Sequence, residues 1–288
     1  MNAPPEVIAL CSAAGLIAGQ VLSLVAVRLP RRMHWDLENE VALAQAELGR
    51  EGQAPAGPRP ALFARGPECE HCGAALRGVG VVPVLGYLIR NARCVACGVS
   101  LPLMGPLVEL TLAVVFGALV AQNGLGIGLL AAAVLAALLV TLAAIDARER
   151  LLPDALTLPG LWIGLTLNAF SVTVDPTSAI LGAAGGWLFM AGSQWLFSRI
   201  TGREGVAAGD HKLVAMMGAW LGWQVLPAIL LLAMGTAALT LVLGRLGAGT
   251  TAQAGETAQA EMPFGPHLAA GGLLIMLGGT SWFSALVL

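Results

Sequence analysis

The chain has 288 residues, of which 57% are apolar and 11% charged, and its formal net charge is -2. With a mean hydropathy of +0.80, it is far more apolar than a soluble core requires, which excludes an ordinary soluble protein and predicts a polytopic membrane protein. The small net charge gives no indication of nucleic-acid binding.

Apolar stretches of about 20 residues, the length that crosses the hydrocarbon layer of a bilayer, occur about eight times. The first has no charged segment before it, so we interpret it as a membrane anchor and not as a cleaved signal. The predicted fold class is therefore an all-α polytopic membrane protein with about eight transmembrane helices. We expect these helices at 6–27, 107–122, 126–145, 155–173, 178–198, 212–224, 226–244 and 267–287.

Basic residues lie on alternate connections between the predicted spans, and the connections near residues 124, 175 and 225 contain none. Cytoplasmic connections of membrane proteins carry an excess of Lys and Arg, so we expect the basic connections to face the cytoplasm and both termini to face away from it. The basic residues beside the spans are Arg28, Arg31, Arg32, Arg90, Arg93, Arg148, Arg150, Arg199, Arg203, Lys212 and Arg245.

A long polar loop follows the first span and is the one candidate for a water-exposed module. We expect three parts: residues 1–27 as the first transmembrane helix, 28–105 as a cytoplasmic loop domain and 106–288 as the main membrane domain. The loop domain opens with a predicted amphipathic helix at 33–50, and a flexible linker follows at 51–60. A second low-complexity stretch, 247–261, precedes the last span.

Two Cys-x-x-Cys pairs lie in this loop, Cys69 with Cys72 and Cys94 with Cys97, and 21 residues separate them. Four thiols in two such pairs are typical of a closed tetrahedral zinc site that stabilises a fold. A redox-active dithiol is the alternative, but it usually occurs as a single pair. Reduced thiols also favour a loop that faces the cytosol. Cys11 lies in an apolar stretch, where we expect a small buried side chain.

Carboxylates near hydrocarbon are costly and therefore indicate function. Asp146 lies at the end of the third predicted span, where a negative charge opposes the helix dipole. Asp210 lies at the start of the sixth, after Gly209, which permits a close approach of the backbone. Two carboxylates in reach of each other do not both ionise readily, so one can act as an acid and the other as a base on water. The alternative is a pair of ordinary helix-end acids neutralised by Arg148 or Lys212.

Two further acids have either a local explanation, from their place at the start of a helix, or a functional one. Asp154 follows Pro153 at the start of the fourth span, where we expect it to cap the helix. Glu109 lies three residues after Pro106, the predicted first residue of the second span, where the positive end of the helix favours a carboxylate.

Several motifs together resemble the type IV prepilin leader peptidase and N-methyltransferase family. The resemblance runs nearly end to end. It rests on Gly19–Pro30, the two Cys-x-x-Cys pairs with their spacing, Pro106-Leu-Val-Glu109-Leu, Ile145-Asp146 through Leu152-Pro153-Asp154 to Pro159, Gly209-Asp210-x-Lys212-Leu213 with Gly218–Gly222, and Pro263-Phe-Gly-Pro266.

The resemblance implies an aspartic endopeptidase of the bacterial inner membrane in which Asp146 and Asp210 are catalytic. It implies prepilin or pseudopilin substrates of type IV pilus and type II secretion systems, cut after a glycine at the cytoplasmic face. It also implies methylation of the new N-terminus with S-adenosylmethionine. Supporting or substrate-binding roles then fall to Gly209, Lys212, Asp154 and Glu109, and zinc shapes the loop.

The chain departs from the family pattern at Ala207, where the family has a glycine, and at His211, where it usually has a small apolar residue. Other departures lie in the N-terminal half, where the resemblance places methyl transfer, at Gln20, Val21, Ser23, Met104 and Gly105. A peptidase that has lost the methyltransferase is therefore one alternative. Two further alternatives belong to other classes. A transporter would carry ions past its acids, although such acids are expected near mid-span. A membrane scaffold would use the zinc loop only to bind a partner.

Overall fold

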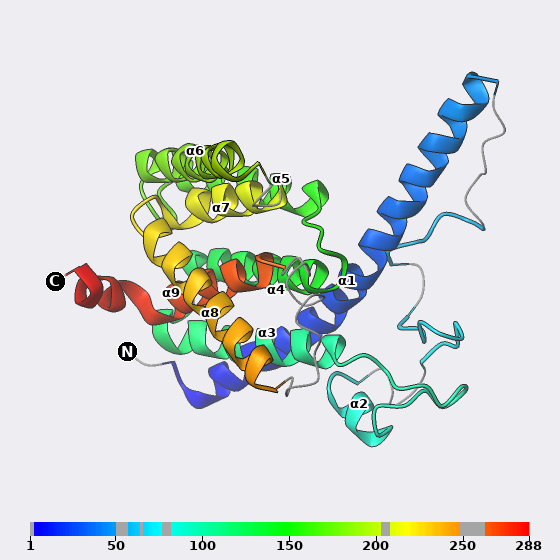
Figure 1. The fold of residues 1–288 in the computed structure, drawn as a ribbon. Coiled ribbons are helices and arrows are strands. Elements are labelled where there is room, and N and C mark those ends of the chain that lie inside the picture. Colours follow the sequence, from blue (N-terminus) through cyan, green and yellow to red (C-terminus); the bar gives the residue numbers. More distant parts are fainter. Residues whose placement is uncertain are drawn as a thin grey trace. The chain divides into compact units, whose positions relative to one another are not determined.

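The computed structural model describes residues 3–49, 57–63, 66–76, 82–202, 208–247 and 263–287. Within these ranges the chain forms helices joined by turns, with isolated β-bridges and no β-sheet (Figure 1). The helices are α1 (Pro5–Glu47), α2 (Leu85–Ile89), α3 (Met104–Asn123), α4 (Ile127–Glu149), α5 (Asp154–Ala169), α6 (Pro176–Thr201), α7 (Ala208–Leu221), α8 (Leu226–Gly247) and α9 (Gly265–Val287).

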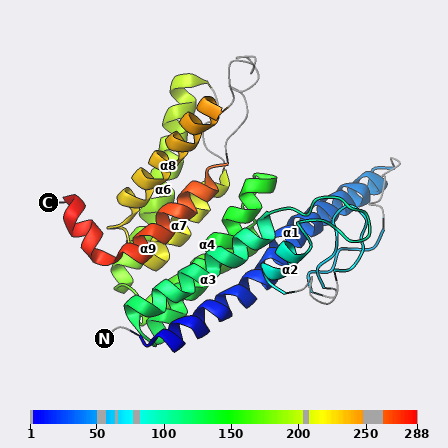
Figure 2. The same ribbon diagram turned by 90° about the horizontal axis from the view of Figure 1, so that it is seen from below.

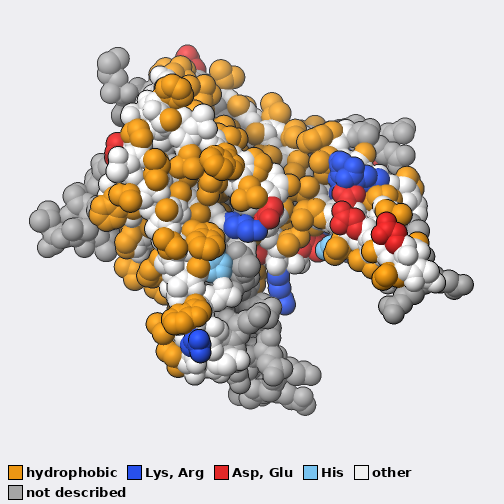
Figure 3. Space-filling view, turned by 90° about the horizontal axis from the view of Figure 1, so that it is seen from above, with side chains coloured by type: hydrophobic (Ala, Val, Ile, Leu, Met, Phe, Trp, Pro, Cys, Tyr) orange, Lys and Arg blue, Asp and Glu red, His pale blue; other side chains and the backbone are white. Residues whose placement is uncertain are grey.

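The all-helical class predicted from the sequence is confirmed for the described residues, since each predicted apolar stretch lies largely on one helix. Four helices, α1, α3, α4 and α8, are long and apolar enough to cross a membrane. Apolar side chains also cover most of the face seen in Figure 3. Such a surface suits lipid better than water, so the chain is a multi-pass membrane protein.

Helix α1 differs from the expectation of a first span followed by a separate amphipathic helix. It is one helix of 43 residues that continues through Pro30. At about 1.5 Å per residue it extends for about 65 Å, roughly twice the thickness of the hydrocarbon layer. The helix therefore provides both a membrane span and a polar extension. The predicted linker at 51–60 falls mostly outside the described residues, as does the low-complexity stretch at 247–261.

The chain divides into two compact units. The N-terminal unit, Leu10–Val114, contains most of α1, the thiol loop, α2 and the first half of α3. Gly15 and Gly19 of α1 lie directly against the backbone of α3, since a Cβ on either would come within 2.5 Å of a backbone atom of Leu112 or Glu109. The two helices are therefore packed backbone to backbone, which only glycine allows.

Polar contacts attach the loop to the extension of α1. Arg28 donates to the carbonyls of Leu62 and Gly66 at 3.0 and 2.5 Å. Further along the helix, Arg31 forms an ion pair with Glu70 at 3.1 Å. The loop thus follows the polar half of α1.

The C-terminal unit comprises Val115 onwards together with the residues before Leu10. Its core is centred on α7, a helix of 14 residues that is buried along most of its length. Helices α5 and α6 pack against α7, and α9 packs against both α4 and α8 (Figures 1 and 2). The largest fully buried side chains of this core are Leu135, Leu139, Leu142, Leu213, Met216, Met217, Trp220, Ile229 and Leu268.

Candidate active site and metal centre

Asp146 lies one turn before the end of α4, as the sequence predicted, and its residue is 6% exposed. Its Oδ2 accepts a hydrogen bond of 2.9 Å from the backbone N–H of Gly265, the first residue of α9. The unfavourable position of this carboxylate at the negative end of α4 is thus offset by the positive end of α9. Sequence reasoning noted the motif around Gly265 but gave it no role.

Asp210 lies in the first turn of α7 and is 4% exposed. It is close enough to Asp146 to be affected electrostatically by that carboxylate. The structure therefore brings together the two acids that the sequence singled out, although 63 residues separate them in the chain. Two carboxylates buried near each other favour a state in which they share one negative charge.

Gly209 is the point of close approach that the sequence indicated. A Cβ at this position would lie 2.9 Å from the Cβ of Leu152, a buried residue in the turn between α4 and α5. Because Gly209 has no side chain, the start of α7 can pack closely against the segment that follows Asp146. Ala207, which stands at the family's preceding glycine position, lies outside the described residues.

Lys212 and Asp154 form an ion pair with an Nζ–Oδ1 distance of 2.6 Å. The predicted cap was wrong, because α5 begins at Asp154 itself and no side chain caps its N-terminus. The alternative in which Lys212 neutralises Asp210 is not the observed pairing either. The ion pair instead joins the N-terminal ends of α5 and α7, one turn away from the acids.

Glu109 also differs from its predicted position. Helix α3 begins at Met104, two residues before Pro106, so Glu109 lies beyond the first turn. The residue is 7% exposed, and its Oε2 accepts a 2.7 Å hydrogen bond from the N–H of Val84, just before α2. Glu109 therefore ties the loop to α3 within the N-terminal unit.

The four cysteines of the loop form one cluster in which all sulfur atoms lie within 4.8 Å of one another. The Cys69–Cys97 and Cys72–Cys94 sulfur distances are both 3.8 Å. A tetrahedral zinc ion with Zn–S bonds of about 2.3 Å requires sulfur–sulfur distances of about 3.8 Å. The donor set and its spacing therefore fit a metal ion.

Backbone amides within the second cysteine pair favour the thiolate form of one of its sulfurs, that of Cys94. The N–H groups of Cys97 and Ala96 point at the Cys94 sulfur and lower the pKa of that thiol to about 6. The thiolate is the form that binds metal. The turn that makes this possible ends at Gly98, which has a φ of +72°, a conformation that glycine adopts without strain.

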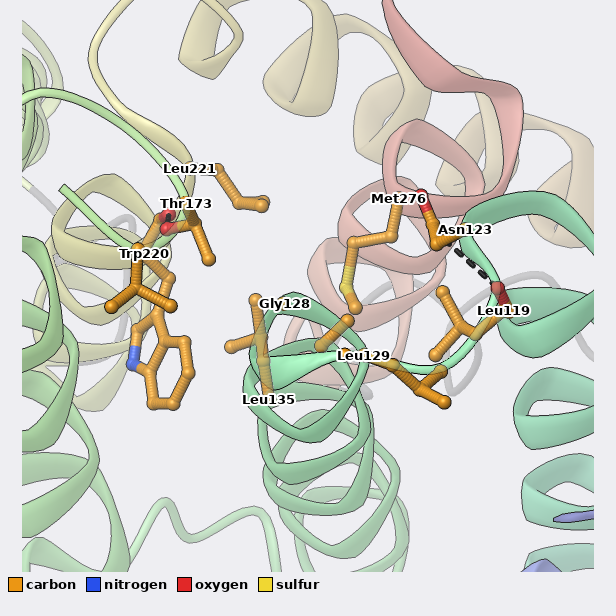
Figure 4. Close-up of a pocket in the computed structure, with 12 residues that line it drawn as sticks. Leu119, Asn123, Gly128, Leu129, Leu135, Thr173, Trp220, Leu221 and Met276 are labelled. Carbon is orange, nitrogen blue, oxygen red and sulfur yellow. Dashed lines mark hydrogen bonds between the residues drawn. The ribbon is translucent and has the colours of Figure 1, made fainter.

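Two cavities lie away from the acid pair. One of about 470 Å³ lies between Trp220 on one side and Asn123 and Met276 on the other, with Leu135 of α4 between them (Figure 4). Trp220 is at the C-terminal end of α7, whereas Asp210 is at its N-terminal end. An adjoining cavity of about 510 Å³ also includes Trp220. Both cavities are therefore near the C-terminal end of α7, and Asp210 is at the other end of this helix.

These features define a multi-pass helical membrane protein with a buried pair of aspartates on two helices of one core, the chemical equipment of an aspartic peptidase. The chain belongs to the type IV leader peptidase family, whose model matches residues 133–243. A second model, the bacterial peptidase A24 N-terminal domain, matches residues 13–123. The matched segments thus contain both aspartates and all four loop cysteines.

Relatives named prepilin leader peptidase/N-methyltransferase are similar to nearly the whole chain. One from Pseudomonas putida is 36% identical over 285 residues, which are 98% of this chain and 94% of the relative. One from Burkholderia pseudomallei is 36% identical over 93% of this chain and 84% of its own length. One from Pseudomonas aeruginosa is 36% identical over 92% and 88%, respectively. No solved structure matches the chain.

Proposed function

We propose that the chain is a prepilin leader peptidase that cuts the leader from prepilin or pseudopilin substrates with Asp146 and Asp210. The observation that carries this proposal is the burial of the two carboxylates beside each other, at the C-terminal end of α4 and the N-terminal end of α7. Two buried acids that form no ion pair among the described residues are expensive in a membrane protein, and catalysis accounts for that cost.

The reaction needs one ionised and one protonated carboxyl group. The ionised member takes a proton from water while the water oxygen bonds to the scissile carbonyl carbon, and the other member gives its proton to the carbonyl oxygen. When the C–N bond breaks, the first carboxyl passes its proton to the leaving nitrogen, and the second recovers a proton from the gem-diol. Both acids thereby return to their starting states.

The positions of the acids suit a substrate that has its apolar helix in the bilayer and its basic leader in the cytosol. Both acids are near the basic ends of their helices, at Arg148, Arg150 and Lys212, which the positive-inside rule assigns to the cytoplasm. We therefore propose eight spans, with α5, α6, α7 and α9 added to the four long apolar helices, in the bacterial inner membrane. Helices α5 and α7, of 16 and 14 residues, are short for this role, and α7 meets protein on most sides in place of lipid.

Zinc is the metal that we assign to the Cys69, Cys72, Cys94 and Cys97 cluster. Four thiolates complete its coordination shell, so the ion stabilises the loop and does not take part in peptide hydrolysis. A loop with so few buried apolar side chains depends on such an ion for its fold.

N-methylation of the new N-terminus is the second activity that we propose, with S-adenosylmethionine as the methyl donor. It is supported by the match to the N-terminal domain model and by the names of the relatives. The departures at Gln20, Ser23, Met104 and Gly105 are the reason to measure this step separately. Loss of methylation with retained cleavage would identify the chain as a peptidase alone.

Co-expression with a prepilin tests the proposal. The unmodified protein should give a product that starts at the residue after the leader, carrying an added methyl group of 14 Da, as judged by mass spectrometry. Asp146→Asn and Asp210→Asn should each leave the leader attached, because neither acid–base pair is complete. Equal processing by unmodified protein and both variants would contradict the peptidase proposal and favour a scaffold.

A further inference from the structure

The start of α9 directs one backbone amide at the catalytic pair, and this amide is not used within the helix. Pro266, the second residue of the helix, has no N–H, and the amides of His267 and Leu268 both donate to the carbonyl of Phe264. The remaining first-turn donor is the N–H of Gly265, which lies 2.9 Å from Asp146 Oδ2. The positive end of α9 is thus directed at one carboxylate.

Glycine is required at this point of contact. A Cβ on residue 265 would lie 2.7 Å from Oδ2, 2.9 Å from Cγ and 3.1 Å from Cβ of Asp146. The first of these distances is shorter than any ordinary carbon–oxygen contact, and the neighbouring atom is the carboxylate itself. Any other residue would therefore displace either the start of α9 or the acid.

The two acids are unequal in this respect. Asp210 receives the dipole of its own helix from its place in the first turn of α7. Among the described residues, however, no hydrogen-bond donor contacts the Asp210 carboxylate, whereas Asp146 has the Gly265 amide. A direct hydrogen bond to a charged group is worth more than a helix-end dipole, so the shared negative charge is more stable on Asp146.

We propose that the Gly265 amide holds the negative charge of the pair on Asp146, which makes Asp146 the base that activates water and Asp210 the acid that protonates the carbonyl. The assignment rests on the peptidase function proposed above and adds a positioning residue, Gly265, from a third helix. The same contact fixes the Asp146 side chain, so that its second oxygen is directed away from α9.

Other titratable groups on the neighbouring helices have different partners or positions. Lys212 of α7 pairs with Asp154 of α5. His267 of α9 contacts the Thr236 hydroxyl of α8 at 3.2 Å through Nδ1. His211 is adjacent to Asp210 and buried, and it is retained in every variant below.

The decisive variant replaces the amide of residue 265 by an ester, through incorporation of glycolic acid, because this removes the N–H without adding a side chain. We expect prepilin cleavage at neutral pH to fall about tenfold or more, and the acid limb of the pH–rate profile to move up by about one pH unit, as the ionised form loses its donor. An ester at Gly272, in the same helix but away from the acids, is the matched control.

Gly265→Ala provides a second variant, in which the added methyl group displaces the acid. Its cleavage rate should fall about 100-fold, since an error of about 1 Å in the placement of a catalytic group has this effect. Gly272→Ala should stay within about threefold, because its new methyl group meets only the flexible ends of Met217 and Leu139, at 3.0 and 3.1 Å.

Thermal unfolding as a function of pH gives a readout that does not depend on cleavage. The ester at 265 should lower the melting temperature at neutral pH, and this difference should shrink as the pH falls and Asp146 gains its proton. A rate loss without any shift of the pH profile would overturn the charge assignment, as would an ester variant equal to the unmodified protein in both assays. If the unmodified protein does not cut prepilin, the peptidase proposal is contradicted. The unfolding data would still show whether the Gly265 amide stabilises the ionised form of Asp146.

Discussion

Buried polar residues of the C-terminal unit are placed to join helices as well as to catalyse. Asn168 is fully buried near the end of α5. Its Nδ2 donates to the carbonyl of Ala219 at 2.8 Å, and its Oδ1 accepts from the backbone amides of Thr173 and Val174 at 2.9 and 3.1 Å. One side chain thus connects the α5–α6 turn to the C-terminal end of α7.

Replacement of Asn168 by Leu should therefore destabilise the protein by at least about 2 kcal/mol, because several buried backbone groups lose their partners at once. Thermal unfolding in detergent measures the effect. Thr166→Val is the control, since the Thr166 hydroxyl is exposed and bonds only to Trp162 of its own helix, and should change stability by about 0.5 kcal/mol or less. Equal melting temperatures for the two variants would contradict the role of Asn168.

The pH response of the α1 extension should depend on the Asp36–Arg59 pair. Arg59 donates two hydrogen bonds to Asp36, at 2.7 and 2.5 Å, and lowers the pKa of that carboxyl below 3.8. A lowered pKa means that the contact stabilises the docked loop above about pH 3.8 and is lost as the pH falls through the lower value.

Hydrogen exchange of residues 57–63 should be faster in Arg59→Gln than in unmodified protein at neutral pH. The difference should disappear in acid, once Asp36 is protonated in both proteins, and should shrink in high salt because the pair is exposed. Exchange rates that differ equally at all pH values would show that Arg59 acts through packing and not through its charge.

At the scale of helices, the contact between α6 and α7 depends on two glycines that face each other. A Cβ on Gly218 would lie 2.2 Å from the carbonyl oxygen of Gly182, and a Cβ on Gly182 would lie 2.4 Å from that of Gly218. These neighbours are backbone atoms, so the helices would have to move apart to admit even a methyl group.

Gly218→Ala should accordingly cost about 1–3 kcal/mol of unfolding free energy or more, the range for inserting a methyl group into a packed core. It should also lower peptidase activity, because α7 carries Asp210. Gly185→Ala, on α6, serves as the control, since no atom lies within 4 Å of the new Cβ. Detergent unfolding and prepilin cleavage measured on both variants would settle the point, and similar values for the two would argue against close packing.

Much of this arrangement could be predicted from local patterns. Apolar length located the helices, the spacing of the cysteines predicted their cluster, and the cost of burying Asp146 and Asp210 singled them out. The Gly265 contact could not be predicted, because it joins residues 119 positions apart and requires knowledge of which helix ends meet. Local rules also failed for Asp154, which forms an ion pair with Lys212 of α7 and does not cap α5.

Local patterns also failed to predict that α1 continues as one helix. An interior proline usually ends a helix, and Pro30 stands where the apolar half of α1 gives way to the polar half. Arg28 and Arg31 lie on either side of it and hold loop segments against the helix. The helix nevertheless continues through Pro30, which the rule for an interior proline does not predict.

At the scale of the whole molecule, the division into two units predicts separate responses to metal removal. Chelation, or Cys72→Ser, should abolish binding of about one zinc ion per chain and expose the loop to proteolysis. The core around α7 contains no loop cysteine and should unfold at an unchanged temperature. Cys11→Ser is the control, since Cys11 is outside the cluster.

Metal content by mass spectrometry and unfolding by near-ultraviolet circular dichroism measure the two responses. A Cys11→Ser protein that lost its zinc would contradict the assignment of ligands. Loss of the α7 core together with the ion would show that the two units fold as one.

The interior proline of α1 also has a mechanical consequence. Because Pro30 lacks an N–H and crowds the preceding turn, α1 lacks one helical hydrogen bond there and bends most easily at this turn. Since Arg28 and Arg31 hold the loop on both sides of this turn, any bending of α1 at Pro30 would strain those contacts. Pro30→Ala would restore the missing helical hydrogen bond and make α1 more rigid without altering a cysteine ligand or an acid.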